Sequence, residues 1–356
     1  MGKLFGTDGI RGVVNDGLDA MLAYKVGMAA AHVMTQEKGG GQPRFAIGKD
    51  TRISSDLLEG ALIAGLCSAG ADVLHLGVIP TPAVAWVTVD TGCDAGVVIS
   101  ASHNPFEHNG IKIFNGRGFK LSDELENRIE DIILNDVAVP LKTGGDIGRV
   151  IYADQQESQD YIDHLVSTIS SDLAGLHILV DCANGAASAT AARLFDRFPD
   201  LHTDVIHADP DGVNINNGCG STHLEQLKAM VKAGGYDLGI AFDGDAIKCH
   251  FSFHFEINAM FQKELLDSVV KGMFQGLVQR KDFQGSPCCD SQRGAVVMDI
   301  EKKSGNIVRF YGGLAGFAQR PAPVFREKED KTEADRRPFA ADHGITPGFD
   351  ARPSYL

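Results

Sequence analysis

Helix and strand patterns alternate along the first 246 residues, and this alternation restricts the fold more than any other feature of the chain. Residues 22–33 carry apolar side chains at helical spacing, whereas residues 44–48 and 96–100 form short apolar runs typical of buried strands. Helices that alternate with strands pack on the faces of one layered sheet. The sequence therefore predicts an α/β fold.

The alternation is interrupted once and then lost. Residues 135–149 contain proline and three glycines and have little periodicity, which is typical of a linker. We therefore predict one α/β domain at residues 1–150 and a second at residues 151–246. From residue 247 the pattern is irregular apart from one helix candidate and two strand candidates, so we expect residues 247–356 to form an atypical, partial or poorly ordered region.

The composition excludes several classes of partner. The net charge of −14 and the pI of about 5.2 argue against binding to nucleic acid. No apolar stretch approaches the length of a membrane span or a signal peptide, so we expect a cytoplasmic protein with no membrane partner. The seven cysteines lack the spacing of metal ligands, which favours buried thiols in a reducing compartment.

The strand candidate at residues 96–100 ends in the string Ser100-Ala101-Ser102-His103-Asn104-Pro105. Open α/β sheets bind their ligands at the carboxyl ends of their strands, and Ser102 is predicted to lie there. A phosphorylated serine held in such a loop can transfer its phosphoryl group to a sugar hydroxyl, given positioning and charge neutralisation. The alternative is an ordinary turn serine that bonds to nearby backbone.

Asp243-Gly244-Asp245 follows another strand candidate, at residues 237–242. Two carboxylates separated by one residue can converge on one hard cation, and Mg²⁺ binds a few carboxylates together with phosphate oxygens. Such a cation would offset the charge of a phosphoserine. The alternative is a common Asp-Gly turn.

Three further side chains are candidates for the same chemistry. Arg11, in the string GTDGIRG, can bind a phosphate through its planar fork, although a surface arginine is the simpler interpretation. Lys112 follows Ser102 by ten residues and can serve as a point charge or an acid–base group. His103 can bond a phosphate or hold the loop in place.

These strings together resemble a known family. GTDGIRG, SASHNP with NGIK, PDGVNINNGCGSTH and AFDGD occur in the order expected for the α-D-phosphohexomutases, and they span about residues 1–246. The resemblance implies successive mixed α/β domains of the phosphohexomutase type, with Ser102 as the phosphorylated residue. It also implies a Mg²⁺ cofactor bound by Ser102, Asp243 and Asp245, and proton transfer assisted by Arg11 and Lys112. His103 would belong to the phosphoserine loop.

The resemblance also implies an activity. The first and third strings are most similar to family members that interconvert glucosamine 6-phosphate and glucosamine 1-phosphate through a sugar bisphosphate. The expected partners are therefore a phosphosugar substrate and a sugar 1,6-bisphosphate activator. Three other hypotheses stay open: a phosphomannomutase or phosphoglucomutase, an inactive phosphosugar-binding remnant, and a Mg²⁺-dependent phosphatase.

The sequence departs from the family after Ala246. The family's metal loop has the form DGDADR, whereas this chain has Ile247 in place of the third carboxylate and Lys248 in place of the arginine. A sugar-recognition loop of the GExSGH type and a phosphate-binding loop of the RxSGTEP type are not found downstream. A shifted reading frame or a divergent replacement after Ala246 is one hypothesis for this change.

Overall fold

The structure is a computed structural model that describes residues 4–154, 156–170, 172–253, 299–301 and 307–310. All of these lie in one compact unit, residues 1–317. Within the part of the chain described, no helix is both long enough and apolar enough to cross a membrane. The predicted helix candidate in the C-terminal region, at residues 265–277, lies outside the described residues.

The first sheet contains seven strands in the order β2-β1-β6-β5-β3-β4-β7. Their bounds are β1 (Ile10–Val14), β2 (Gly17–Leu18), β3 (Arg44–Lys49), β4 (Asp72–Val78), β5 (Ala95–Ile99), β6 (His108–Asn115) and β7 (Val150–Tyr152). Strands β5, β3, β4 and β7 run parallel, whereas β6 is antiparallel to both β5 and β1. The predicted layered sheet is therefore present, and it is mixed.

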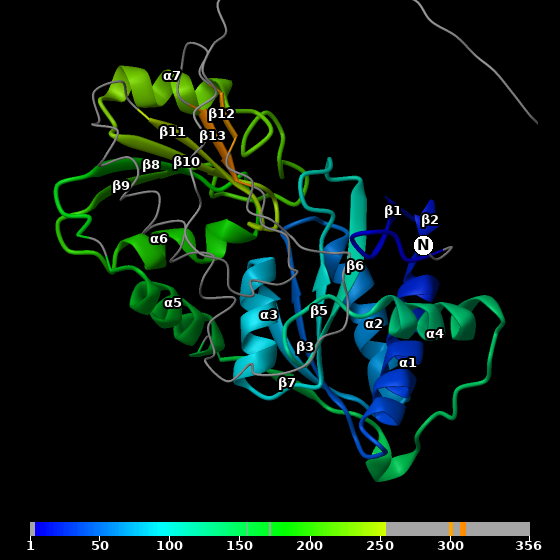
Figure 1. Cartoon of the computed structure of the whole chain (residues 1–356). Helices are drawn as coiled ribbons and strands as arrows, with labels where there is room; N and C mark the ends of the chain where they lie inside the picture. Colours follow the sequence, from blue (N-terminus) through cyan, green and yellow to red (C-terminus); the bar gives the residue numbers. More distant parts are fainter. Residues whose placement is uncertain (1–3, 155, 171, 254–298, 302–306, 311–356) are drawn as a thin grey trace, which may run out of the picture. The chain divides into compact units, whose positions relative to one another are not determined.

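Four helices pack against the first sheet: α1 (Ala20–Glu37), α2 (Ser55–Ser68), α3 (Thr81–Asp90) and α4 (Asp123–Leu134). Figure 1 shows α1, α2 and α4 on one side of the sheet and α3 on the other. Ser122 caps helix α4, because its hydroxyl accepts a hydrogen bond from the Leu125 amide at 3.4 Å. Helix α3 has Pro82 in its first turn, where the missing amide hydrogen of proline costs no helical hydrogen bond.

Strand β5 shows why the sheet is covered on both faces. Successive side chains of a strand point to opposite faces. Val97 and Ile99 accordingly pack into the core formed with α1, α2 and α4, whereas Val98 packs with Val84 of α3. Every residue of β5 is buried. The strand is thus held between two apolar layers, and the loop that follows it starts from a fixed point.

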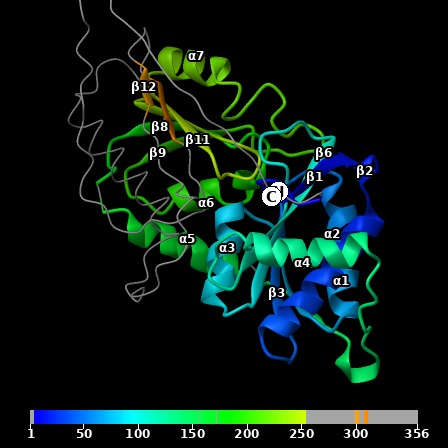
Figure 2. The same ribbon diagram turned by 45° about the vertical axis from the view of Figure 1, so that its right-hand side comes forward.

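The second sheet has the order β12-β13-β11-β10-β8-β9. Its strands are β8 (His177–Asp181), β9 (His202–Ile206), β10 (Leu238–Phe242), β11 (Cys249–Phe253), β12 (Asp299–Glu301) and β13 (Ile307–Phe310). Its helices are α5 (Gln156–Thr168), α6 (Ala191–Phe195) and α7 (Glu225–Gly234), with short 3-10 turns at η1 (Gly144–Asp146) and η2 (Ala186–Ala189). Figure 2 shows α6 and α7 on opposite sides of β8 and β9.

The α/β prediction is confirmed, with local differences. After β8, the chain forms the 3-10 turn η2 followed by the five-residue α6. The strand predicted at residues 306–311 is β13, and β12 overlaps the end of the strand predicted at residues 294–300, most of which lies outside the described residues. Strand β7 belongs to the first sheet and extends past residue 150, and β11 belongs to the second sheet and begins after residue 246. The domain boundaries at these two residues stay predictions.

Candidate active site

Two loops that are far apart in the sequence meet at the ends of β5 and β10. Ser102 lies in the loop after β5, and Asp243 is the first residue after β10. The Ser102 hydroxyl donates a hydrogen bond of 2.6 Å to Oδ2 of Asp243. Both residues are buried, with exposed fractions of 4% and 0%. The structure therefore brings together the serine and the first aspartate named from the sequence.

Gly244 makes this close approach of the loops possible. A Cβ atom at this position would lie 2.6 Å from the carbonyl oxygen of Ser102, which is too close for any side chain to be accommodated. The aspartate loop also closes on itself, because Oδ1 of Asp243 accepts a hydrogen bond of 2.9 Å from the Lys248 amide. The glycine between the two aspartates is thus required by packing against the serine loop.

The second aspartate is held by two other elements. Oδ2 of Asp245 lies 2.6 Å from Nζ of Lys112, which comes from β6. The same oxygen accepts a hydrogen bond of 3.2 Å from the hydroxyl of Thr81, at the start of α3. The sequence indicated Lys112 but not Thr81. Nothing in the pattern around Thr81 pointed to a contact 164 residues away.

The two aspartates differ in their preferred charge. Burial, together with the neighbouring charge of Asp245, raises the pKa of Asp243 to about 7. Burial opposes ionisation of Asp245 as well, but the Lys112 ammonium outweighs it and holds the pKa of Asp245 below its ordinary value. The site therefore contains one carboxylate that is paired with a cation and one that is not.

Arg11 and His103 lie at the border of this site. Arg11 is in β1 beside β6, and its guanidinium donates to Asp8 at 3.1 Å. Nδ1 of His103 lies 3.4 Å from Nζ of Lys248. Burial and the positive charges of Lys248 and Arg11 lower the pKa of His103, so its imidazole is neutral at pH 7. Within the described residues, no hydrogen bond joins Arg11 or His103 to Ser102 or to the two aspartates of the site, Asp243 and Asp245.

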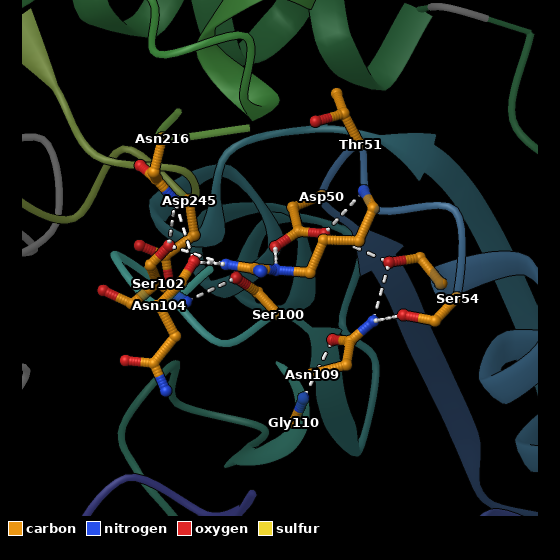
Figure 3. Close-up of polar contacts among 12 residues, drawn as sticks. Asp50, Thr51, Ser54, Ser100, Ser102, Asn104, Asn109, Gly110, Asn216 and Asp245 are labelled. Atoms are coloured by element: carbon orange, nitrogen blue, oxygen red, sulfur yellow. Dashed lines mark hydrogen bonds and ion pairs between the residues drawn. The ribbon is translucent and has the colours of Figure 1, made fainter. Parts of the chain in front are cut away.

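The serine loop rests on side chains that the sequence did not single out. Figure 3 shows Asp50, Ser100 and Asn216 around the backbone of Ser102 and Asn104. The Ser100 hydroxyl accepts a hydrogen bond of 2.9 Å from the Ser102 amide. Short polar side chains beside such a loop carry no distinct sequence pattern, because they act through backbone groups that every residue has.

The donor set fits a hard cation. Asp243 and Asp245 present two buried carboxylates, of which Asp243 contacts the Ser102 oxygen. Among the described residues, Lys112 is the only cationic side chain in contact with either carboxylate, and it contacts Asp245. Oxygen donors with an excess of negative charge are what Mg²⁺ requires. Ile247 offers no side-chain oxygen, so this chain supplies one carboxylate fewer than the pattern DGDADR.

A second group of possible ligands lies apart from Ser102. Donor atoms of Asp181, His207 and Cys219 all lie within 4.8 Å of one another. The Asp181 carboxylate already accepts hydrogen bonds from the amides of Ala183 and Gly220, at 2.9 and 2.8 Å. These bonds tie the loops after β8 and before α7 together, so Asp181 has a structural task there.

Comparisons with known proteins identify the family of this chain. The family model for domain I of phosphoglucomutase/phosphomannomutase, an alpha/beta/alpha domain, matches residues 2–138, and the model for domain II matches residues 159–251. These matches include Ser102 and both aspartates. The chain belongs to the phosphoglucomutase/phosphomannomutase family, which confirms the resemblance to the phosphohexomutases and its extent.

The curated relatives narrow the similarity. The chain is 55% identical over 249 residues to the phosphoglucosamine mutase of Acetivibrio thermocellus, covering 69% of this chain and 54% of that protein. It is 52% identical over 250 residues to the phosphoglucosamine mutase of Clostridium acetobutylicum, covering 70% and 55%. The chain thus spans about half the length of the curated relatives that it matches.

Solved structures show the same fold. A phosphoglucomutase/phosphomannomutase family protein from Burkholderia thailandensis is 29% identical, with a TM-score of 0.60, over 70% of this chain and 54% of that one. A putative phosphomannomutase from Thermus thermophilus, 22% identical, matches with the same TM-score over 70% and 56%. The second likeness concerns the fold alone.

Proposed function

We propose that this chain is a phosphoglucosamine mutase, which interconverts glucosamine 6-phosphate and glucosamine 1-phosphate. The observation that carries the proposal is the 2.6 Å contact between the Ser102 hydroxyl and Asp243, both buried. It occurs in a chain that is 55% identical to a relative of that name. The enzyme would be an intramolecular phosphotransferase that carries its phosphoryl group on Ser102.

The proposed cycle exchanges one phosphoryl group for another. A sugar hydroxyl attacks the phosphorus of phospho-Ser102, the P–Oγ bond breaks, and a sugar 1,6-bisphosphate forms. The hydroxyl loses its proton to the protein, and the Ser102 oxygen gains one. The sugar then turns, and its other phosphoryl group returns to Ser102. No phosphate is lost, because each P–O bond that breaks is replaced by another.

Individual side chains have distinct tasks in this cycle. Asp243 accepts the hydrogen bond of the free Ser102 hydroxyl and so directs its oxygen toward the site. Lys112 and Arg11 are proposed to assist the movement of the proton, and His103 to hold the loop. Mg²⁺ would be held by the Ser102 phosphate, Asp243 and Asp245, where it neutralises charge on the phosphoryl group. Lys112 balances part of the charge of Asp245.

The proposal extends to the organisation of the chain. Residues 1–150 would supply the phosphoserine loop, residues 151–246 the aspartate loop, and residues 247–356 an atypical region. A sugar 1,6-bisphosphate would load Ser102 before the first turnover. Because the chain spans about half of its curated relatives, both the activity and the choice of sugar are parts of the proposal.

A coupled assay on glucosamine 6-phosphate tests the proposal. It is run with Mg²⁺ and catalytic glucose 1,6-bisphosphate, beside parallel reactions on mannose and glucose phosphates. We expect formation of glucosamine 1-phosphate at a higher kcat/KM than for either other sugar. A preference for mannose or glucose phosphate would replace the proposed substrate but keep the reaction class.

Two further outcomes would overturn the reaction class itself. Binding of glucosamine 6-phosphate in calorimetry without turnover would show a phosphosugar-binding protein. Net release of inorganic phosphate would show a phosphatase. The same samples answer both questions when free phosphate is measured beside the isomerised product.

A further inference from the structure

Arg52 lies fully buried behind the serine loop, with an exposed fraction of 2% for the residue and 0% for its side chain. Its Nη2 donates hydrogen bonds to the carbonyl oxygens of Ser102, at 3.0 Å, and Asn104, at 2.8 Å. Its Nη1 donates to the carbonyl oxygen of Pro105. One guanidinium thus contacts the backbone of three of the four residues from 102 to 105.

The charge of Arg52 is balanced on its other side. Nε of Arg52 lies 2.9 Å from Oδ2 of Asp50, and the Arg52 amide donates to Oδ1 of the same carboxylate at 3.0 Å. A buried guanidinium needs such a partner, because an unpaired buried charge is strongly destabilising. The planar fork spreads its donors over several acceptors, which a point-charge ammonium does not do.

Asn216 reaches the same two carbonyl groups from the loop between β9 and α7. Its Nδ2 donates to the carbonyl oxygen of Ser102 at 3.0 Å and to that of Asn104 at 3.2 Å. Asn216 is also buried, with an exposed fraction of 6%. Each carbonyl oxygen has two lone pairs, so each can accept from Arg52 and from Asn216 together. Figure 3 shows Asn216 beside Ser102 and Asn104.

Two more hydrogen bonds join the segments that carry these side chains. The Ile53 amide donates to the carbonyl oxygen of Gly212 at 2.9 Å. The Thr51 hydroxyl donates to the carbonyl oxygen of Asn184 at 2.6 Å. The segment around Arg52 is therefore tied to the loops of the second sheet as well as to the serine loop.

The backbone of Ser102 needs this support. Its φ of +56° lies in the left-handed region, which is unfavourable for a residue with a Cβ atom. That backbone conformation sets the direction of the side chain, and the hydroxyl consequently reaches Oδ2 of Asp243 at 2.6 Å. Neither Arg52 nor Asn216 makes a hydrogen bond to the Ser102 hydroxyl itself, so their effect passes through the backbone.

We propose that Arg52 and Asn216 are positioning residues that form a carbonyl clamp, defined by their four hydrogen bonds to the carbonyl oxygens of Ser102 and Asn104. The clamp holds Ser102 in the orientation in which its oxygen exchanges phosphoryl groups. It joins one donor from the first sheet's loops and one from the second's, so the carrier is ordered only when both are in place. This inference rests on the proposed role of Ser102 as phosphate carrier.

The test measures how fast Ser102 takes up phosphate in the full chain. Arg52→Lys keeps the charge but loses the fork, and Asn216→Asp keeps the shape but loses the donor. Each is mixed with excess ³²P-labelled glucose 1,6-bisphosphate and Mg²⁺ over a range of bisphosphate concentrations. We expect the maximal labelling rate to fall about 100-fold, because a displaced reacting group loses a factor of this size.

The concentration that gives half the maximal rate separates positioning from loss of structure. We expect it to stay within about twofold of wild type, because both clamp side chains are buried and bonded to the carbonyl groups of the loop. Asp94→Ala is the matched control. Asp94 lies at the opposite end of β5 and holds the Arg44 amide at 2.8 Å, so it stabilises the same strand without touching the loop. This control should label within about threefold of wild type at a temperature well below its unfolding transition.

The double variant Arg52→Lys/Asn216→Asp tests whether the two residues act together. Because both act on the same carbonyl groups, the combined loss should be much smaller than the product of the two single losses. Losses that multiply, or single variants that label at the wild-type rate, would overturn the clamp.

Amide hydrogen exchange keeps this test separate from the proposed function, since it needs no phosphate. We expect peptides containing residues 100–105 to exchange faster in Arg52→Lys and Asn216→Asp, but not in Asp94→Ala. Wild-type protein that takes up no phosphate contradicts the proposed function, and the exchange data then decide on the clamp alone. Unchanged exchange in both variants would refute it.

Discussion

The serine loop and the aspartate loop are joined by the Ser102–Asp243 hydrogen bond and by the contact of His103 with Lys248, but they are stabilised in opposite ways. The serine loop, residues 100–105, is held through its backbone by Ser100, Arg52 and Asn216. The aspartate loop, residues 243–248, contains two buried carboxylates and closes on its own amides. Hydrogen bonds thus fix the backbone of the serine loop, whereas the aspartate loop carries negative charge that is not fully balanced. Changes of shape should therefore disable the first, and changes of charge the second.

The largest expected effect is at the contact itself. Ser102→Ala removes the only oxygen that the proposed cycle phosphorylates, so labelling by ³²P-labelled glucose 1,6-bisphosphate should be abolished. Intact-mass analysis after incubation measures this directly. Ser122→Ala, which removes the cap of α4, is the control; it should be labelled normally and lose about 1 kcal/mol of stability. Phosphate found on the Ser102→Ala protein would contradict the assignment.

The aspartate loop should respond to loss of charge more than to loss of shape. Asp243→Asn is nearly isosteric, yet we expect the Mg²⁺-dependent labelling rate of Ser102 to fall at least about 100-fold, because the variant lacks one charged oxygen ligand. Asp237→Asn is the matched control, since Asp237 precedes β10, which Asp243 follows, and its carboxylate holds the His177 amide at 2.9 Å. An equal loss in both variants would show an effect of stability instead.

The unbalanced charge should also appear as a pH dependence of stability in Mg²⁺-free protein. Burial raises the pKa of Asp243 to about 7, so the folded protein holds a proton that the unfolded chain has already lost. Stability is therefore lost as pH rises through this range, by about 2 kcal/mol between pH 5.5 and 7.5. Thermal unfolding at both pH values measures it.

Asp243→Asn supplies the reference for that measurement. The variant cannot titrate at this position, so its stability should fall by less than that of wild type between the two pH values. The other titrating groups are shared and cancel in the difference between the two proteins. Parallel curves for both proteins would show that Asp243 is ionised in the folded state at the lower pH.

The same contrast explains what the sequence could predict. The alternation of apolar patterns predicted the layered sheet, because burial of one face of a helix or strand produces a periodic spacing of apolar residues in the sequence. Ser102, Asp243 and Asp245 could be named because they belong to a distinctive order of strings. Arg52 and Thr81 could not be named, because their role depends on contacts with backbone or carboxyl groups 50 and 164 residues away.

Strand β6 shows a second limit of the sequence. It pairs antiparallel with both β5 and β1, and it carries Lys112 to the aspartates. Its residues, His108–Asn115, mix polar and apolar side chains, so they lack the uninterrupted apolar run by which β5 was recognised. Two of its polar residues are buried: Asn109 donates to the hydroxyls of Ser54 and Ser55, and Lys112 contacts Asp245. The polar residues of β6 interrupt its apolar pattern, so the sequence did not predict this strand.

The smallest expected effect restores charge where this chain has lost it. Ile247→Asp places a third carboxylate in the aspartate loop, in the pattern DGDAD, two residues after Asp245. With one more charged oxygen donor, half-maximal labelling of Ser102 should need about tenfold less Mg²⁺. Ile247→Asn is the control, because it offers a neutral oxygen of the same size and should gain much less. A Mg²⁺ titration of the labelling rate measures all three proteins.

Without Mg²⁺ the same substitution should act in the opposite direction. A third carboxylate near Asp243 and Asp245 adds repulsion to a loop that Lys112 only partly neutralises, so Ile247→Asp should lower the unfolding midpoint in chelator. Added Mg²⁺ should then raise that midpoint further than in wild type, since a ligand that binds the folded state stabilises it. A shape change in the serine loop, such as Arg52→Lys, should show no such reversal, and a reversal there would break the contrast between the two loops.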